Sequence, residues 1–145
     1  MKKNTLILFI LISVITPFSF KINDEFTVSK KGIDFYKGTF KEALDKAKTE
    51  NKYVFVDVYA TWCGPCKMLK RKTFKDKEVG DYYNKNFINI AIDGETPEGE
   101  EIIAKYKIQG YPTLLIVDAS GKLKTKQMGF IEPHILVNFG KRIVP

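Results

Sequence analysis

The chain has 145 residues, of which 44% are hydrophobic and 28% are charged. This length suits one domain with one hydrophobic core, and the composition excludes an intrinsically disordered protein. The formal net charge of +7 is spread along a chain that carries no nucleic-acid-binding motif and no internal repeat. We therefore expect no nucleic-acid partner.

The first 20 residues have the pattern of an export signal. Lys2 and Lys3 precede an unbroken apolar run over residues 6–12. The uncharged stretch of residues 4–20 is near the lower limit for a helix that spans a bilayer, and Pro17 near its end favours a cleaved signal. We predict that residues 1–20 are a signal peptide and that the protein is exported. Anchoring in the membrane through residues 5–20 is the alternative.

A linker with a short edge strand at residues 33–38 is expected between this signal and the folded domain. Residues 21–38 are mixed and polar, and "IDFYKG" suits an edge strand. Thr39 and Glu42 have the spacing of a capping box, and apolar residues follow at helical spacing, so a helix is predicted over 40–50. The domain is therefore placed at residues 39–145.

The segment "YVFVDVYA", residues 53–60, predicts a central strand that is buried on both faces. Asp57 is its one charged residue. A carboxyl group inside such a strand is desolvated, which raises its pKa. The alternative is an edge position or a shifted register that leaves Asp57 in water.

The remaining elements alternate between helices and strands. A helix is predicted over 67–79 and a short one around Val79, Tyr82 and Tyr83. A buried strand follows over 87–93, and Thr96 with Pro97 begins another helix. Residues 113–118 form a third strand, a tight turn leads to a fourth at 123–128, and Pro133 starts the last helix. This order predicts an α/β fold with a mixed sheet.

Cys63 and Cys66 are the only cysteines, so any thiol chemistry involves them. Gly64, Pro65 and Cys66 suit the first turn of a helix, since proline lacks the amide that a helix start leaves without a partner. The positive end of a helix favours the thiolate form of a cysteine. We expect Cys63 to be the exposed nucleophile and Cys66 to attack the mixed disulfide that Cys63 forms.

Two other uses of this cysteine pair fit less well. A structural disulfide would close a loop of only two residues, which removes little chain entropy. A zinc site usually needs four ligands, and the chain offers these two cysteines and one histidine, His134, far along the sequence. A redox pair is therefore the favoured interpretation, and no metal is expected.

Three motifs in order resemble the thioredoxin family: Asp57, then "ATWCGPCK" with Cys63 six residues after that aspartate, then "GYPT" at 110–113. The resemblance covers about residues 39–142. It implies the thioredoxin fold, a central mixed sheet flanked by helices, in which Pro112 is cis and lies against the cysteine pair. In this family the backbone beside that proline pairs with a bound substrate peptide as an added strand.

The resemblance also implies roles for the site residues. Asp57 would accept the proton of Cys66 as that thiol attacks, and the dithiol is itself the redox group, so no cofactor is required. Tyr111 is either a substrate contact or a packing residue. The residues that would bind substrate are Trp62, Gly64, Pro65, Tyr111 and Pro112.

Some features depart from cytosolic thioredoxins. Asn89 stands where many of them carry a lysine near the buried aspartate, and residues 94–100 include a few extra positions. The pattern C-K…T-F-x-D-x-x-V after Cys63 is similar to the C-terminal domains of bacterial transmembrane thiol–disulfide interchange reductases. Those domains are exported, so this similarity implies a periplasmic location. In family terms, Gly-Pro between the cysteines implies a reductant of protein disulfides, which in that compartment would require a membrane electron donor. A protein of this size with a single cysteine pair is expected to be a monomer. The alternatives are a disulfide oxidase or isomerase, which "GYPT" also fits, and a peptide-binding module with an idle disulfide.

The helix that follows the cysteines is strongly basic. Its charges belong to Lys67, Lys70, Arg71, Lys72, Lys75 and Lys77. They form a solvated helix face, or they stabilise the Cys63 thiolate and attract acidic partners.

Overall fold

The structure is a computed structural model that describes residues 32–145. The predicted signal peptide or anchor at 1–20, and the linker up to residue 31, lie outside the described residues. Within residues 32–145, no helix is both long enough and apolar enough to cross a membrane.

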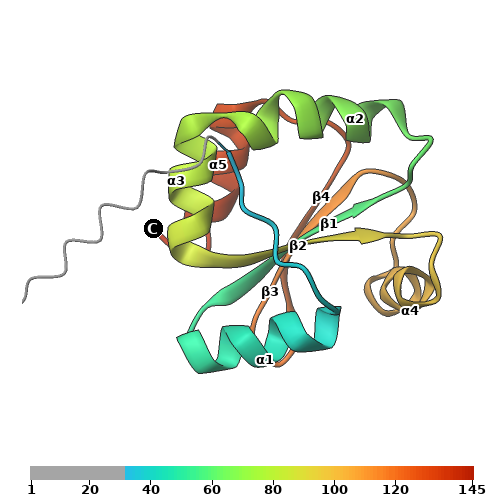
Figure 1. Ribbon diagram of the computed structural model, residues 1–145, viewed down its shortest axis with the longest axis horizontal. Coiled ribbons are helices and arrows are strands. Elements are labelled where there is room, and N and C mark those ends of the chain that lie inside the picture. The colour runs from blue at the N-terminus through green and yellow to red at the C-terminus, as the bar shows by residue number, and fades with distance from the viewer. Residues whose placement is uncertain (1–31) are drawn as a thin grey trace, which may run out of the picture.

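Four strands form one mixed sheet in the order β2-β1-β3-β4 (Figure 1). The parallel pair is β1 (Tyr53–Tyr59) and β2 (Phe87–Asp93). β3 (Thr113–Val117) runs antiparallel to β1, and β4 (Leu123–Met128) runs antiparallel to β3. The central position of β1 is the one predicted from its apolar segment, which only Asp57 interrupts.

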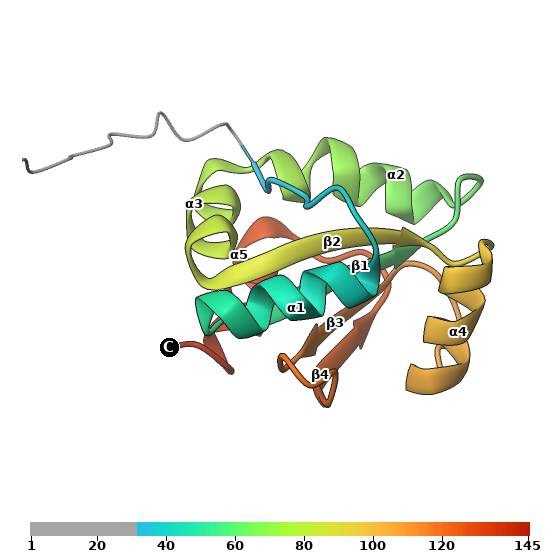
Figure 2. The same cartoon turned by 60° about the horizontal axis from the view of Figure 1, so that its bottom comes forward.

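Helices cover both faces of this sheet (Figures 1 and 2). One face carries α1 (Phe40–Glu50) and α4 (Pro97–Tyr106). The other carries α2 (Gly64–Arg71), α3 (Lys77–Asn86) and α5 (Pro133–Lys141). The predicted α/β class, with a mixed sheet flanked by helices, is confirmed.

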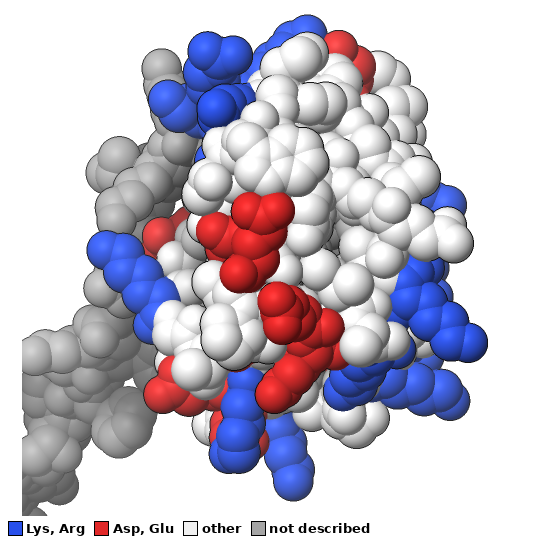
Figure 3. Space-filling model, turned by 90° about the vertical axis from the view of Figure 1, so that its right-hand side faces the viewer, with Lys and Arg blue, Asp and Glu red and all other residues white. Residues whose placement is uncertain are grey.

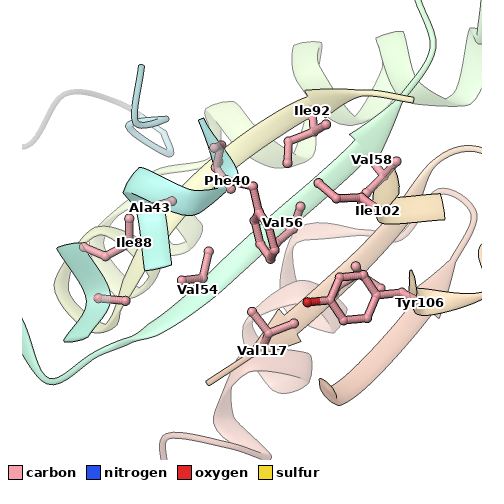
Figure 4. Packing of buried hydrophobic residues seen from close by; sticks show 13 residues of the cluster. Phe40, Ala43, Val54, Val56, Val58, Ile88, Ile92, Ile102, Tyr106 and Val117 are labelled. Carbon is pink, nitrogen blue, oxygen red and sulfur yellow. The ribbon is translucent and has the colours of Figure 1, made fainter. Parts of the chain in front are cut away.

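Alternation along β1 divides the core into two clusters. Val54, Val56 and Val58 pack with α1 and α4, as Figure 4 shows. Phe55 packs on the opposite face with residues of α2, α3 and α5. Since side chains alternate along a strand, Asp57 points to the same face as Phe55, toward the side that α2 covers.

The predicted caps of two helices are present. Thr39 accepts a hydrogen bond from the Glu42 amide, while the Glu42 carboxylate accepts one from the Thr39 amide. Thr96 caps α4 through the Gly99 amide, with Pro97 as the first helical residue. Each cap satisfies backbone N–H groups that a helix start leaves free.

Two sequence predictions of secondary structure are wrong. Residues 33–38 do not form an edge strand: the Ile33 amide donates to the Phe74 carbonyl and the Tyr36 amide to the Asn89 carbonyl, without a continuous ladder. The segment packs on the fold instead of joining the sheet, because its apolar side chains contact both core clusters.

The predicted helix over 67–79 is interrupted at Lys72, because α2 ends at Arg71 and Lys72 is its C-cap residue. A short 3₁₀ helix, η1 (Thr73–Lys75), follows. The buried Thr73 hydroxyl donates to the Ile131 carbonyl, and Asp76 begins α3 by accepting from the Val79 amide. Both side chains offer local hydrogen bonds that compete with a continuous helix.

Candidate active site

The cysteine pair lies where β1 leads into α2. Cys63 is the N-cap residue of α2, and its sulfur accepts a hydrogen bond from the Cys66 amide at 3.1 Å. The two sulfurs form a disulfide of 2.06 Å with the Cα atoms 5.3 Å apart. Pro65 occupies the first turn, as the sequence predicted. A thiolate at Cys63 would therefore be stabilised by the Cys66 amide and by the positive end of the helix.

The expectation that Cys63 is exposed is wrong for this disulfide form. Cys63 is 3% exposed and Cys66 is 2% exposed. The reason is packing, because Tyr59 and Tyr111 cover the small cluster that the cysteines form with Ala60. Gly64 and Pro65 remain exposed, so the site opens to solvent over the start of α2.

Asp57 lies beneath α2 in the sheet. It is 1% exposed, and neither carboxyl oxygen has a hydrogen-bond partner among the described residues. Burial raises the pKa of Asp57 to about 7, and the Lys70 ammonium partly opposes that rise. The prediction of a buried carboxyl with a raised pKa is confirmed, and the alternative of a solvated Asp57 is wrong.

Lys70 is the charged neighbour of Asp57 that sequence reasoning did not identify. It lies on α2 four residues after Cys66, which is about one helical turn, and its Nζ lies 3.9 Å from the centre of the Tyr59 ring. A cation over an aromatic ring is held by the ring's negative face. The sequence signal for this proximity is the four-residue spacing from Cys66, which places Lys70 on the same side of the helix one turn further along.

Asn89 makes contacts that lead away from Asp57. Its register partner on β1 is Phe55 rather than Asp57. Its side-chain amide donates to the Asp34 carbonyl and to the Asn84 side chain. Asn89 therefore anchors the segment before α1, and no described contact couples it to the buried carboxyl.

The loop before β3 forms the opposite wall of the site. The Tyr111–Pro112 peptide bond is cis, and Pro112 is buried. The Thr113 hydroxyl donates to the Gly110 carbonyl at 2.7 Å, which closes the turn. Tyr111 contacts the cysteine cluster and also borders the exposed surface, so both interpretations of this side chain have support.

Trp62 is the large exposed side chain beside the dithiol. It is 66% exposed, and its ring meets that of Tyr111 edge to face with 5.9 Å between centroids. Its Nε1 donates to the Glu95 carboxylate at 2.8 Å. Sequence reasoning missed Glu95, although it lies in the extra stretch after β2 that the sequence revealed.

This arrangement can exchange two electrons with a substrate disulfide. It combines a vicinal dithiol at a helix start, a buried carboxyl that titrates near neutral pH and an exposed aromatic surface. The structure brings together four of the residues predicted for the site. Tyr111 packs against Cys63 and Cys66, and its ring also meets that of Trp62. Asp57 lies on the face of β1 that α2 covers, and the buried Pro112 follows Tyr111 through the cis bond.

Known proteins share this architecture. The thioredoxin-like domain model matches residues 40–142. A thioredoxin of Mycoplasmoides gallisepticum is 36% identical over 98 residues, covering 68% of this chain and 91% of that protein. The solution structure of a candidate disulphide isomerase from Bacteroides thetaiotaomicron has 42% identity and a TM-score of 0.69, over 77% of this chain and 92% of that one.

The oxidised C-terminal domain of Neisseria meningitidis DsbD is also similar, with 28% identity and a TM-score of 0.60 over 70% of this chain and 90% of that domain. The chain spans only 15–19% of the length of the complete DsbD proteins that it matches. Family match, relatives and geometry agree on one conclusion. This chain belongs to the thioredoxin-like family of thiol–disulfide oxidoreductases and has the thioredoxin fold, with Cys63 and Cys66 as its cysteine pair.

Proposed function

We propose that the protein is an exported reductant of protein disulfides in the bacterial cell envelope. The observation that carries this proposal is a Cys63–Cys66 disulfide at the start of α2, combined with a buried Asp57 on the β1 face that α2 covers, whose carboxyl has no hydrogen-bond partner among the described residues. Such a carboxyl has no structural hydrogen bond to maintain, so it is free to exchange a proton.

In the first step the reduced protein attacks. The Cys63 thiolate forms a bond to one sulfur of the substrate disulfide, and the other substrate sulfur leaves as a thiolate that takes a proton from water. The Cys66 amide, which donates to the Cys63 sulfur at the helix start, favours the Cys63 thiolate. The result is a mixed disulfide between Cys63 and the substrate.

In the second step Cys66 resolves the mixed disulfide. Asp57 accepts the Cys66 proton, and the Cys66 thiolate attacks the Cys63 sulfur and displaces the remaining substrate thiolate. The substrate has then gained two electrons and the protein holds the Cys63–Cys66 disulfide. A pKa of about 7 suits a proton acceptor at neutral pH.

The substrate would bind between α2 and the loop before β3. Trp62 and Tyr111 offer an aromatic surface next to the exposed Gly64 and Pro65. A substrate peptide can pair in extended form with the backbone beside Pro112, as an added strand. No metal or organic cofactor takes part in these steps.

The direction and the location rest on sequence features and similarities. Gly-Pro between the cysteines, and similarity to a thioredoxin and to a DsbD C-terminal domain, favour a reductant. Residues 1–20 favour export to the periplasm, with anchoring through residues 5–20 as the alternative. A reductant in that compartment requires a membrane electron donor, and we expect the protein to act as a monomer.

Disulfide isomerisation is the second candidate function. It is favoured by the 42% identity to the candidate disulphide isomerase of Bacteroides thetaiotaomicron. The same two cysteines would serve, but the reaction would return to a reduced protein without net electron transfer. A peptide-binding module that never cycles its disulfide is the remaining alternative.

Trapping the intermediate tests the chemical roles. A Cys66→Ser variant should accumulate a mixed disulfide through Cys63 with substrate proteins, because the resolving thiol is absent. A Cys63→Ser variant should accumulate far less, and the double variant none. Equal trapping by both single variants would refute the assigned order, and full function of the double variant would establish a binding module.

The mass of the mature N-terminus tests the location. A protein recovered from the envelope that begins after residue 20 would support a cleaved signal. An intact Met1 in the membrane fraction would support the anchor, and an intact Met1 in the cytoplasm would refute export.

A further inference from the structure

The exposed edge of the site has an acidic wall. Glu95 follows β2 and accepts a hydrogen bond from the Trp62 indole at 2.8 Å. Both residues are exposed, and the Trp62 ring packs edge to face against the Tyr111 ring. Glu95 therefore stands at the rim of the aromatic surface that borders the dithiol.

The backbone holds Glu95 in this position. Its amide donates to the Asp93 carboxylate at 3.0 Å, and the next residue, Thr96, donates to the Asp93 carbonyl through both its amide and its hydroxyl. The Gly94 amide donates to the Tyr59 carbonyl at the end of β1. This turn is tied to the ends of β1 and β2, and the hydrogen bond from the Trp62 indole holds the Glu95 carboxylate at the rim.

Glu95 acts together with two other carboxylates. The Tyr111 hydroxyl packs against Gly94, which lies between Asp93 and Glu95 in the chain. Burial raises the pKa of the Tyr111 phenol, and the charges of Glu95, Asp93 and Glu100 raise it further. None of the three has a lysine or arginine at ion-pair distance within residues 32–145. The indole is a neutral donor, so it leaves the Glu95 charge uncompensated.

The surface view agrees with this grouping. Figure 3 looks at the end of the molecule that carries α4 and the start of α2, and acidic side chains gather there beside an uncharged stretch. Basic side chains lie mainly toward the margins of this view. Of the basic residues that follow the cysteines, Lys72 pairs with Glu132 and Lys70 lies over Tyr59, so these two charges are engaged elsewhere.

We propose that Glu95 determines substrate specificity by selecting protein segments that carry lysine or arginine beside the cysteine that Cys63 attacks. This inference rests on the proposed function, since it concerns which disulfides the same dithiol reduces. A segment seated over Trp62 and Tyr111 would place its neighbouring side chains against the carboxylate rim. A basic side chain there gains an ion pair, and an acidic one meets like charge.

The size of the effect follows from the exposure of the rim. Ion pairs between exposed side chains are weak and are screened by salt. We expect a lysine beside the substrate cysteine to raise kcat/KM about two- to five-fold over glutamine at low salt, with a further decrease for glutamate.

The experiment uses three disulfide-linked peptides that differ only in having Lys, Gln or Glu beside the cysteine. Their reduction by the reduced protein is followed for the wild type and for Glu95→Gln, which keeps an acceptor for the Trp62 indole but removes the charge. Glu78→Gln is the matched control, because Glu78 lies in the first turn of α3 and the net charge changes equally.

The wild type should prefer Lys over Gln over Glu, and this preference should shrink with added salt. Glu95→Gln should reduce the Lys-to-Glu ratio at least two-fold, while Glu78→Gln leaves the ratio unchanged. An unchanged ratio in Glu95→Gln, or an equal loss of rate for all three peptides, would overturn the inference. If the wild type reduces all three peptides equally, only the inference fails. If it reduces none, the proposed function fails as well.

Discussion

Replacing Asp57 by asparagine should stabilise the oxidised protein relative to the wild type as pH rises. The difference in unfolding free energy between the two proteins should therefore favour Asp57→Asn more at alkaline pH than at acidic pH. Asp57 is 1% exposed, and neither of its oxygens has a described hydrogen-bond partner. A charge at this position is poorly solvated, so ionisation of Asp57 destabilises the folded state. Asparagine keeps the shape of the side chain and cannot ionise.

The magnitude follows from the pKa. The folded value of about 7 lies about three pH units above the ordinary value of 3.8. Because the folded pKa is the higher one, the unfolded chain binds fewer protons between these values, and stability falls as pH rises. Each unit corresponds to about 1.4 kcal/mol, so the full loss is about 4 kcal/mol, of which about 2–3 kcal/mol falls between pH 5 and pH 8.

The assay is urea unfolding of both oxidised proteins at several pH values from 4 to 9. The difference between the two unfolding free energies cancels every titrating group that they share. It should change in favour of Asp57→Asn as pH rises and level off above the folded pKa. Asp57→Ala should show the same pH dependence with a constant offset for the lost packing.

A difference that is flat across this range would refute the reasoning. It would mean that Asp57 has nearly the same pKa in both states and that burial does not control its ionisation. A change of the opposite sign would mean that the folded state stabilises the carboxylate.

Three further substitutions test other parts of the structure. Lys70→Gln should raise the pKa of Asp57 further, because the opposing charge is lost; carboxyl titration by NMR would show this, and an unchanged titration would contradict it. Thr39→Ala should cost about 1 kcal/mol in urea unfolding through loss of the capping box, and no loss would contradict the cap's contribution. Gly99→Ala should lower the free energy of unfolding by about 1–3 kcal/mol, because a Cβ there would lie 2.1 Å from the Asp93 carbonyl oxygen at the end of β2. Gly64→Ala is the control, because a Cβ at that position meets nothing within 4 Å. Equal effects of the two substitutions would refute the close approach.

Local patterns in the sequence predicted most of the fold. The apolar run around Asp57 identified the central strand, and the Thr39–Glu42 spacing identified the start of α1. These patterns involve only a few neighbouring residues, so they determine local structure without help from contacts that are distant in the sequence. The predicted helix over 67–79 was wrong because its break depends on a distant partner: the Thr73 hydroxyl bonds the Ile131 carbonyl.

The site residues were predicted where they are adjacent in sequence or belong to a motif of the resembled family, and were missed where only the fold brings them together. Cys63 and Cys66 lie within one turn, so their pairing could be inferred from spacing. Lys70 lies near Asp57 only because α2 packs on the sheet. Glu95 lies near Trp62 only because β2 pairs with β1. The burial of Cys63 likewise depends on side chains from separate segments.

The reduction potential of the Cys63–Cys66 couple tests the central claim most directly. It can be measured by equilibrating the protein in defined thiol buffers and following the fluorescence of Trp62, the single tryptophan, which lies beside the pair. A reductant should give a value near about −270 mV, the range of thioredoxin. A value of about −180 to −120 mV would contradict that direction and indicate an isomerase or an oxidase.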